Sequence, residues 1–249
     1  MSSTPGVTIS PTGQKIFIPL ENNPAVFSDL VHRLGVSSQL TFHDVYSLDL
    51  IQSIPRPAHA LILIAPAPVY YAVRSKYDGY PSTPPITYNA SGPAKPVIWF
   101  KQTIGHACGL YSLIHAVGNG SAKAHIHRDS LLDRLLHSAI PLKRKERAEV
   151  LYNSQELEEA HMASARMGDS RAPSSQEPVG YHFITFVKGD DGHLWELEGS
   201  WDPLDRGELG ADEDVLSAKA LEVGVGKYMR EAEVVGNAEL SIVALATGE

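Results

Sequence analysis

Hydrophobic residues recur at helical spacing in several parts of the chain. Four of them between Leu110 and Val117 keep the spacing i, i+3, i+4, i+7, which predicts an amphipathic helix that begins beside Cys108. A similar stripe over residues 26–34 follows Asn23-Pro24, a helix cap with proline at the first helical position. Further helices are expected over residues 131–136, 143–160 and 211–230.

Short apolar runs predict the strands of a sheet. Residues 60–65, Ala-Leu-Ile-Leu-Ile-Ala, are all apolar, which is typical of a central strand buried on both faces. Residues 182–187 and 193–198 flank the turn sequence Lys-Gly-Asp-Asp-Gly and predict a hairpin. Further strands are expected over residues 39–46, 97–100 and 240–246, with long loops over residues 75–96 and 163–180.

The order of these elements indicates one α+β domain. Helices dominate the first part of the chain and strands the last part, and no repeat or linker divides the 249 residues. A hydrophobic fraction of 43% is enough for a sizeable core. We therefore expect a single domain over residues 1–249, in which residues 1–14 form a flexible N-terminal segment.

Charge and composition narrow the classes of function. A net charge of −8 disfavours binding to nucleic acid through phosphate contacts and suits a cationic partner. No apolar run is long enough to span a membrane, and no secretory signal is visible. The single cysteine excludes an intrachain disulfide. We expect a monomer in the cytoplasm, with the nucleus as a second compartment, that binds neither nucleic acid nor membrane and uses no cofactor.

Cys108 is the first candidate for chemistry. It directly precedes the apolar stripe of a predicted helix, and the positive end of the helix dipole favours the reactive thiolate. Small neighbours, Gly105, Ala107 and Gly109, leave room for a substrate carbonyl. The alternative is a buried structural cysteine, which is common in proteins.

The predicted hairpin offers a base and a carboxylate together. If the hairpin is centred on Asp190, His182 lies directly opposite Glu198, and opposed side chains share a face of the sheet. A carboxylate beside an imidazole fixes its tautomer and stabilises the imidazolium, so the pair suits general base catalysis. The alternative is an ordinary polar pair across two strands.

Gln102 lies six residues before Cys108, at the end of a predicted strand. A side-chain amide close to a nucleophile can donate a hydrogen bond to an oxyanion. The alternative is a loop glutamine that hydrogen-bonds to solvent.

The segment Gln102-Thr-Ile-Gly-His-Ala-Cys-Gly-Leu110, with the helical stripe after it, resembles the active-site segment of the ubiquitin C-terminal hydrolases. The resemblance covers the chain from about residue 15 to the C-terminus in the order expected for that family. Its other segments are Pro19–Pro24, Phe42–Tyr46, Pro55-Arg56-Pro57, His182-Phe-Ile and Leu194-Trp-Glu-Leu-Glu-Gly199.

The resemblance implies a role for each candidate. Cys108 would be the nucleophile, His182 the general base and then acid, and Gln102 the oxyanion donor. The family's third member is usually an aspartate, which Glu198 replaces here with one more methylene group. His106 stands where the family usually has asparagine. The implied fold is papain-like, a central antiparallel sheet flanked by helices with a knotted backbone, in a compact single-domain member.

The resemblance also implies a substrate. The family cleaves small or unfolded adducts from the C-terminal glycine of ubiquitin, and residues 163–180 would be the crossover loop that limits what passes the active site. Glu21 and Asp44 match positions that contact ubiquitin and are candidate partners of its basic tail, or else solvated surface carboxylates. Two alternatives remain: the same chemistry on a ubiquitin-like modifier, and an inactive module that binds ubiquitin.

Overall fold

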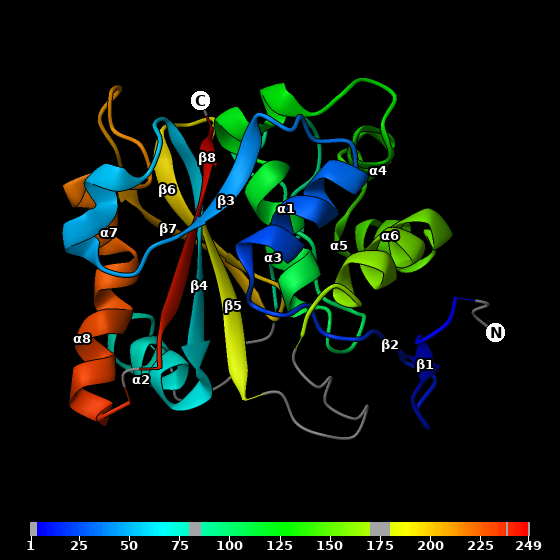
Figure 1. Cartoon of the computed structure of the whole chain (residues 1–249), viewed down its shortest axis with the longest axis horizontal. Helices are drawn as coiled ribbons and strands as arrows, with labels where there is room; N and C mark the ends of the chain where they lie inside the picture. Colours follow the sequence, from blue (N-terminus) through cyan, green and yellow to red (C-terminus); the bar gives the residue numbers. More distant parts are fainter. Residues whose placement is uncertain (1–3, 80–85, 170–179, 238, 249) are drawn as a thin grey trace.

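The computed structural model describes residues 4–79, 86–169, 180–237 and 239–248. Its centre is a six-stranded, fully antiparallel sheet with the strand order β3-β8-β4-β5-β6-β7. Helices cover both faces of this sheet, as Figure 1 shows. The strands of the sheet are β3 (Leu40–Asp44), β4 (Ala58–Pro66), β5 (Tyr181–Lys188), β6 (His193–Glu198), β7 (Trp201–Glu208) and β8 (Ser241–Thr247).

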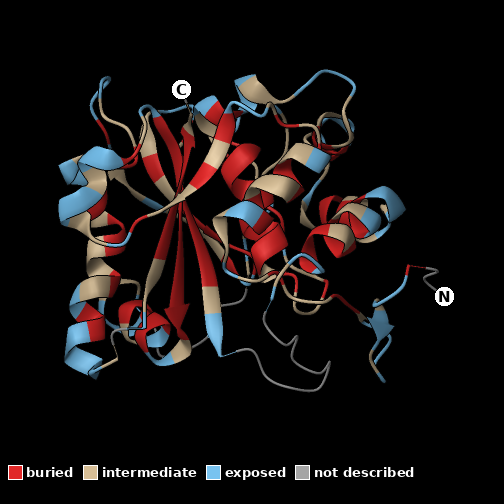
Figure 2. Ribbon diagram, viewed as in Figure 1, coloured by how far each residue is buried: buried red, intermediate tan, exposed pale blue. Residues whose placement is uncertain are grey.

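The apolar run that predicted a central strand forms the middle of the sheet. All nine residues of β4 are buried, and β4 pairs with β8 on one side and β5 on the other. Figure 2 shows the buried centre of the sheet with exposed residues on the outer helices. A strand buried on both faces needs apolar side chains in both directions, which explains the absence of alternation in residues 60–65.

The two faces of the sheet carry separate hydrophobic clusters. The larger cluster packs one face of the sheet against one group of helices, and the smaller cluster packs the other face against a second group. The first group of helices is α1 (Pro24–Arg33), α3 (Cys108–Val117), α4 (Leu131–Ala139), α5 (Arg144–Tyr152) and α6 (Gln155–Ala165). The second group is α2 (Ala67–Tyr77), α7 (Ala218–Val223) and α8 (Val225–Val235), and two 3₁₀ helices span Leu48–Ser53 and Gly120–His125.

Two of the predicted helices are each divided into two. Residues 143–160 form α5 and α6, because Ser154 caps α6 by accepting a hydrogen bond from the backbone N–H of Leu157. Residues 211–230 form α7 and α8, which meet at Gly224, whose backbone leaves the helical region at φ −97° and ψ −107°. In both cases a single residue, Ser154 or Gly224, separates two helices although the residue pattern predicts one continuous helix.

Helix α2 and strand β7 are the longest elements that were not predicted. Helix α2 begins with prolines at positions 66 and 68, and its last residues fall in the segment 75–96 that we expected to be a loop. Strand β7 contains Pro203 and few apolar residues, because it is an edge strand that pairs with β6 alone. Proline therefore hid one helix and one strand from the hydrophobic pattern.

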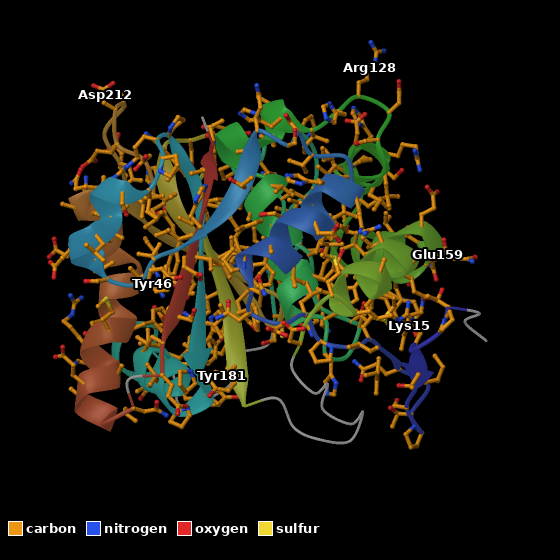
Figure 3. The ribbon with its side chains drawn as sticks, in the orientation of Figure 1. Lys15, Tyr46, Arg128, Glu159, Tyr181 and Asp212 are labelled. Carbon is orange, nitrogen blue, oxygen red and sulfur yellow. The ribbon has the colours of Figure 1, made fainter. Side chains whose placement is uncertain are left out.

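The N-terminal segment pairs with the loop before Cys108. Strands β1 (Thr8–Ile9) and β2 (Lys15–Ile16) form a small hairpin, and Ile16 makes a parallel bridge to Gly105. The side chain of Lys15, labelled in Figure 3, reaches Glu158 of α6 at 2.8 Å. The flexibility that we expected of residues 1–14 stays a prediction, and residues 1–3 lie outside the described residues.

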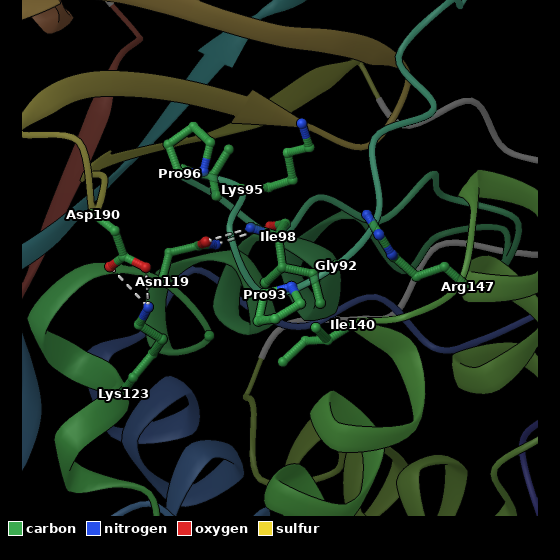
Figure 4. A pocket seen from close by; sticks show the side chains of 12 residues that line it. Gly92, Pro93, Lys95, Pro96, Ile98, Asn119, Lys123, Ile140, Arg147 and Asp190 are labelled. Carbon is green, nitrogen blue, oxygen red and sulfur yellow. Dashed lines mark hydrogen bonds and ion pairs between the residues drawn. The ribbon is translucent and has the colours of Figure 1, made fainter.

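Residues 97–100 are not a strand, contrary to prediction. Their side chains are apolar because Trp99 and Phe100 enter the core, but their backbone is satisfied by side chains instead of a sheet partner. Asn119 accepts from the N–H of Ile98 and donates to its carbonyl, as Figure 4 shows, and His115 accepts from the N–H of Phe100. The pocket in Figure 4 contains none of the predicted site residues in its lining.

Candidate active site

Cys108 is the first residue of helix α3, as the sequence predicted. It is partly buried, and the helix behind it is buried along nearly its whole length. Gly109 lies close to Leu20 and Phe183, where a Cβ would come within 3.4 to 3.5 Å of both side chains. A small residue next to Cys108 therefore lets α3 approach strand β5.

The thiol of Cys108 is protonated at neutral pH in this arrangement. Burial raises its pKa to about 12, although the backbone N–H groups of Gly109 and Cys108 act in the opposite direction. We expected the helix terminus to favour the thiolate; desolvation outweighs it. Formation of the nucleophile therefore requires a base that accepts the proton.

The hairpin brings His182 and Glu198 together, but in a different register from the predicted one. Thr185 pairs with Leu197 and Lys188 with Leu194, so the turn is centred on Asp191 and not on Asp190. This register places Glu198 opposite Ile184, one position along the same face from His182. The direct pairing was wrong, but a shift of two residues keeps both side chains on one face.

The imidazole of His182 and the carboxylate of Glu198 lie close together. Nδ1 of His182 lies 3.7 Å from Oε1 of Glu198. Glu198 is 5% exposed, and its carboxylate accepts hydrogen bonds from the backbone N–H and the hydroxyl of Ser200, at 2.8 to 2.9 Å. Ser200 thus holds the longer glutamate side chain in place beside His182.

Cys108 and His182 belong to segments that touch. Phe183, the residue after His182, packs against Gly109, the residue after Cys108. Within the described part of the chain, however, no hydrogen bond joins the sulfur of Cys108 to His182. The side chains of Ile184 and Phe186 belong to the cluster that faces α2 and α8, so the even-numbered position of His182 directs its ring toward that face of the sheet.

The ring of Tyr70 stacks on the imidazole ring of His182. The two rings are 6° from parallel, with centroids 3.8 Å apart, and Tyr71 meets the same imidazole edge-on at 5.5 Å. Both tyrosines come from α2, a helix that the hydrophobic pattern did not predict. The register of β4 against β5 explains the contact, because Pro66, just before α2, pairs with Tyr181.

Gln102 lies beside the turn that follows Glu198. Its backbone N–H donates to the carbonyl of Gly199 at 2.8 Å, and a Cβ at Gly199 would come within 2.6 Å of the Gln102 Cβ. Its side-chain amide donates to the carbonyl of Ile104 at 3.0 Å. The structure therefore brings Gln102 to the carboxylate segment, with its amide engaged inside its own loop.

His106 has a left-handed backbone, with φ at 55°. Asparagine, aspartate and histidine are the residues other than glycine that are enriched in this region. The replacement of the family's asparagine by His106 is thus compatible with the turn that leads to Cys108.

The two acidic candidates for substrate binding lie on neighbouring segments. Asp44 ends β3 opposite Val243 of β8, and Asn22, next to Glu21, donates to Ser241 of the same strand at 2.7 Å. Glu21 also packs against Gly168 of the predicted crossover loop, whose first residues, 163–165, belong to α6 and whose residues 170–179 lie outside the described residues. Whether either residue contacts ubiquitin stays a prediction.

Metal and membrane chemistry find no support in the described ranges. No cluster of three or more histidine, cysteine or acidic side chains there could hold a metal ion. No helix in those ranges is both long and apolar enough to cross a bilayer.

Comparisons with known proteins identify the family of the chain. The model of the family described as ubiquitin carboxyl-terminal hydrolase, family 1, matches residues 17–230. The chain is 34% identical to the ubiquitin carboxyl-terminal hydrolase of Aplysia californica, over 88% of this chain and 97% of that protein. It is 32% identical to the human ubiquitin carboxyl-terminal hydrolase isozyme L1, over 91% and 96%.

A solved structure supports the fold. The Trichinella spiralis UCH37 catalytic domain, bound to ubiquitin vinyl methyl ester, matches with a TM-score of 0.67 at 20% identity, over 93% of this chain and 95% of that one. The likeness confirms the predicted α+β fold with a central antiparallel sheet. The knotted backbone stays a prediction.

Proposed function

The chain belongs to family 1 of the ubiquitin carboxyl-terminal hydrolases and is a cysteine-type deubiquitinating hydrolase, and we propose that Cys108, His182 and Glu198 form its triad. The observation that carries this proposal is the meeting of three features. The only cysteine begins a buried helix, that helix packs on strand β5, which contains His182, and Glu198 lies 3.7 Å from the imidazole.

The first step is proton transfer from Cys108 to His182. Because burial raises the thiol pKa to about 12, the sulfur becomes a nucleophile only when the imidazole lies beside it. Glu198 stabilises the imidazolium that forms. The thiolate then attacks the carbonyl carbon of the C-terminal glycine of ubiquitin, and His182 returns the proton to the leaving amine. Water, activated by the same imidazole, then hydrolyses the thioester, which releases the carboxyl group of ubiquitin and returns a proton to the sulfur of Cys108.

The negative oxygen of the tetrahedral intermediate needs donors. The backbone N–H of Cys108 is one of the first N–H groups of α3, which have no partner within the helix. The amide of Gln102 is the second donor, and it must exchange its hydrogen bond to Ile104 for one to the oxyanion.

We propose that Glu21 and Asp44 bind the basic tail of ubiquitin. Both are acidic in a chain of net charge −8 and lie beside the first residues of β8, and Glu21 also packs against Gly168 of the crossover segment. This segment, residues 163–180, restricts the leaving group to small or unfolded adducts. The expected monomer, without nucleic acid or membrane, and the cytoplasmic or nuclear location are part of the same proposal.

Hydrolysis of defined conjugates tests the specificity. The purified protein should release a small fluorophore or a short peptide from the C-terminus of ubiquitin, and should leave a conjugate to a stably folded protein intact. The same fluorophore attached to a ubiquitin-like modifier tests whether such a modifier, and not ubiquitin, is the preferred substrate. Faster turnover of that modifier, or equal cleavage of the folded conjugate, would contradict the proposed specificity.

A further inference from the structure

Tyr70 covers one face of the His182 imidazole. The ring planes differ by 6° and the centroids are 3.8 Å apart, which is contact distance for stacked rings. Tyr70 is 1% exposed, so its phenol is a fixed part of the core and not a surface side chain that folds over the histidine. Burial also raises the pKa of Tyr70, which keeps the phenol neutral.

A buried ionic network holds Tyr70 from behind. The guanidinium carbon of Arg74 lies over the Tyr70 ring, 4.6 Å from its centroid. Arg74 in turn donates to Glu196 at 2.6 Å and to Asp78 at 2.7 Å, and Tyr228 donates to the same oxygen of Glu196 at 2.6 Å. These bonds tie α2 to β6 and α8, so the position of the phenol is set by three elements.

Charges in this network are balanced. Burial alone would raise the pKa of Glu196, but Arg74 and Arg206 outweigh it and lower that pKa to about 2. Arg206 also binds Asp78 through two nitrogens, at 2.5 and 2.9 Å. Buried ionic groups seldom add net stability, and their best supported use is to fix one arrangement of the surrounding elements.

We propose that Tyr70 is a positioning residue for His182. The stack fixes the plane of the imidazole, so that Nδ1 is directed to Glu198 and Nε2, on the opposite side of the ring, remains available for the proton of Cys108. The inference rests on the proposed function, because it assigns His182 as the base. It adds α2, which carries no triad member, to the machinery of the reaction.

Three variants separate a positioning role from a structural one. Tyr70→Phe keeps the stacked ring, and Tyr70→Leu removes it. Phe186→Leu is the matched control, because Phe186 is a buried aromatic residue of the same cluster that meets Tyr228 edge-on, 6.3 Å away. Each variant is first checked for folding by thermal denaturation.

Steady-state hydrolysis of a ubiquitin–fluorophore amide gives the decisive readout. We expect Tyr70→Leu to lower kcat by about 10- to 100-fold with little change in KM, as for a misplaced catalytic group. Tyr70→Phe and Phe186→Leu should stay within about twofold of the wild type, because both keep the ring on His182. An unchanged kcat in Tyr70→Leu, or an equal loss in Phe186→Leu, would overturn the inference.

Proton NMR tests the stack without any substrate. The ring current of Tyr70 should shift the His182 side-chain protons upfield, in signals that His182→Gln removes. The shift should persist in Tyr70→Phe and vanish in Tyr70→Leu; its absence from the wild type would overturn the inference. A wild-type protein with this shift but no turnover of any ubiquitin adduct would instead overturn the proposed function.

Discussion

His106 illustrates how a single backbone angle limits the residues that can precede the nucleophile. Its φ of 55° is accessible to asparagine and glycine but not to a β-branched side chain. We expect His106→Asn to leave the free energy of unfolding unchanged, and His106→Val to lower it by about 1 to 3 kcal/mol. Urea denaturation measures both; equal stability of the two variants would show that the turn relaxes.

Glu198 is the second residue, after His106, at which the chain departs from its family. We expect Glu198→Gln to lower kcat by about 100-fold or more, because an amide no longer stabilises the imidazolium. Glu198→Asp keeps the carboxylate but moves it away from the imidazole, which it approaches to 3.7 Å in the wild type. This variant should therefore lower kcat less than Glu198→Gln does. The exposed Glu208→Gln on β7 is the control. Full activity of Glu198→Ala would show that another group serves His182.

At the scale of elements, the sequence predicted those that are defined by local patterns. The helix at Cys108, the buried strand β4 and the hairpin that carries His182 and Glu198 were all recognised. The register was misjudged by two residues, because Asp190 and Asp191 are equivalent turn residues by type. The contact of Tyr70 with His182 was out of reach, because it depends on a helix that begins with prolines and on how that helix packs.

The pairing of the N-terminal segment with the loop before Cys108 yields a test by truncation. Gly105 makes two backbone hydrogen bonds with the N-terminal segment: its carbonyl accepts from the N–H of Phe17, and its N–H donates to the carbonyl of Lys15. Removal of residues 1–14 keeps both bonds. Removal of residues 1–17 deletes these bonds and the buried Phe17 ring. We expect the longer truncation to lower the free energy of unfolding by about 3 kcal/mol or more, and the shorter by about 1 kcal/mol or less. Equal effects on urea denaturation would contradict the pairing.

At the scale of the whole molecule, buried ionisable groups predict how stability depends on pH. Burial lowers the pKa of His115 to about 3 and of His161 to about 4, from an ordinary 6.5. Between pH 6.5 and the lowered pKa values, the unfolded chain binds protons at these histidines that the folded chain does not. The free energy of unfolding therefore has its full value above pH 6.5 and falls as the pH decreases below it. Glu196, with a pKa of about 2, adds a further loss below pH 4.5.

Denaturant titrations between pH 7 and pH 5 measure this dependence. Each neutral histidine should contribute a slope of up to about 1.4 kcal/mol per pH unit. His115 accepts a hydrogen bond from Phe100, and a glutamine oxygen can do the same, so His115→Gln should reduce the slope. A stability that is constant over this range, or an unchanged slope in the variant, would contradict the assignment of a neutral, buried His115.

The central claim is that Cys108 attacks the C-terminal glycine of ubiquitin. The most direct measurement is the intact mass of the protein after incubation with ubiquitin vinyl methyl ester. We predict a covalent one-to-one adduct at Cys108 in the wild type and none in Cys108→Ser. A wild-type protein that binds ubiquitin but gains no mass, or an adduct that survives in Cys108→Ser, would contradict the account.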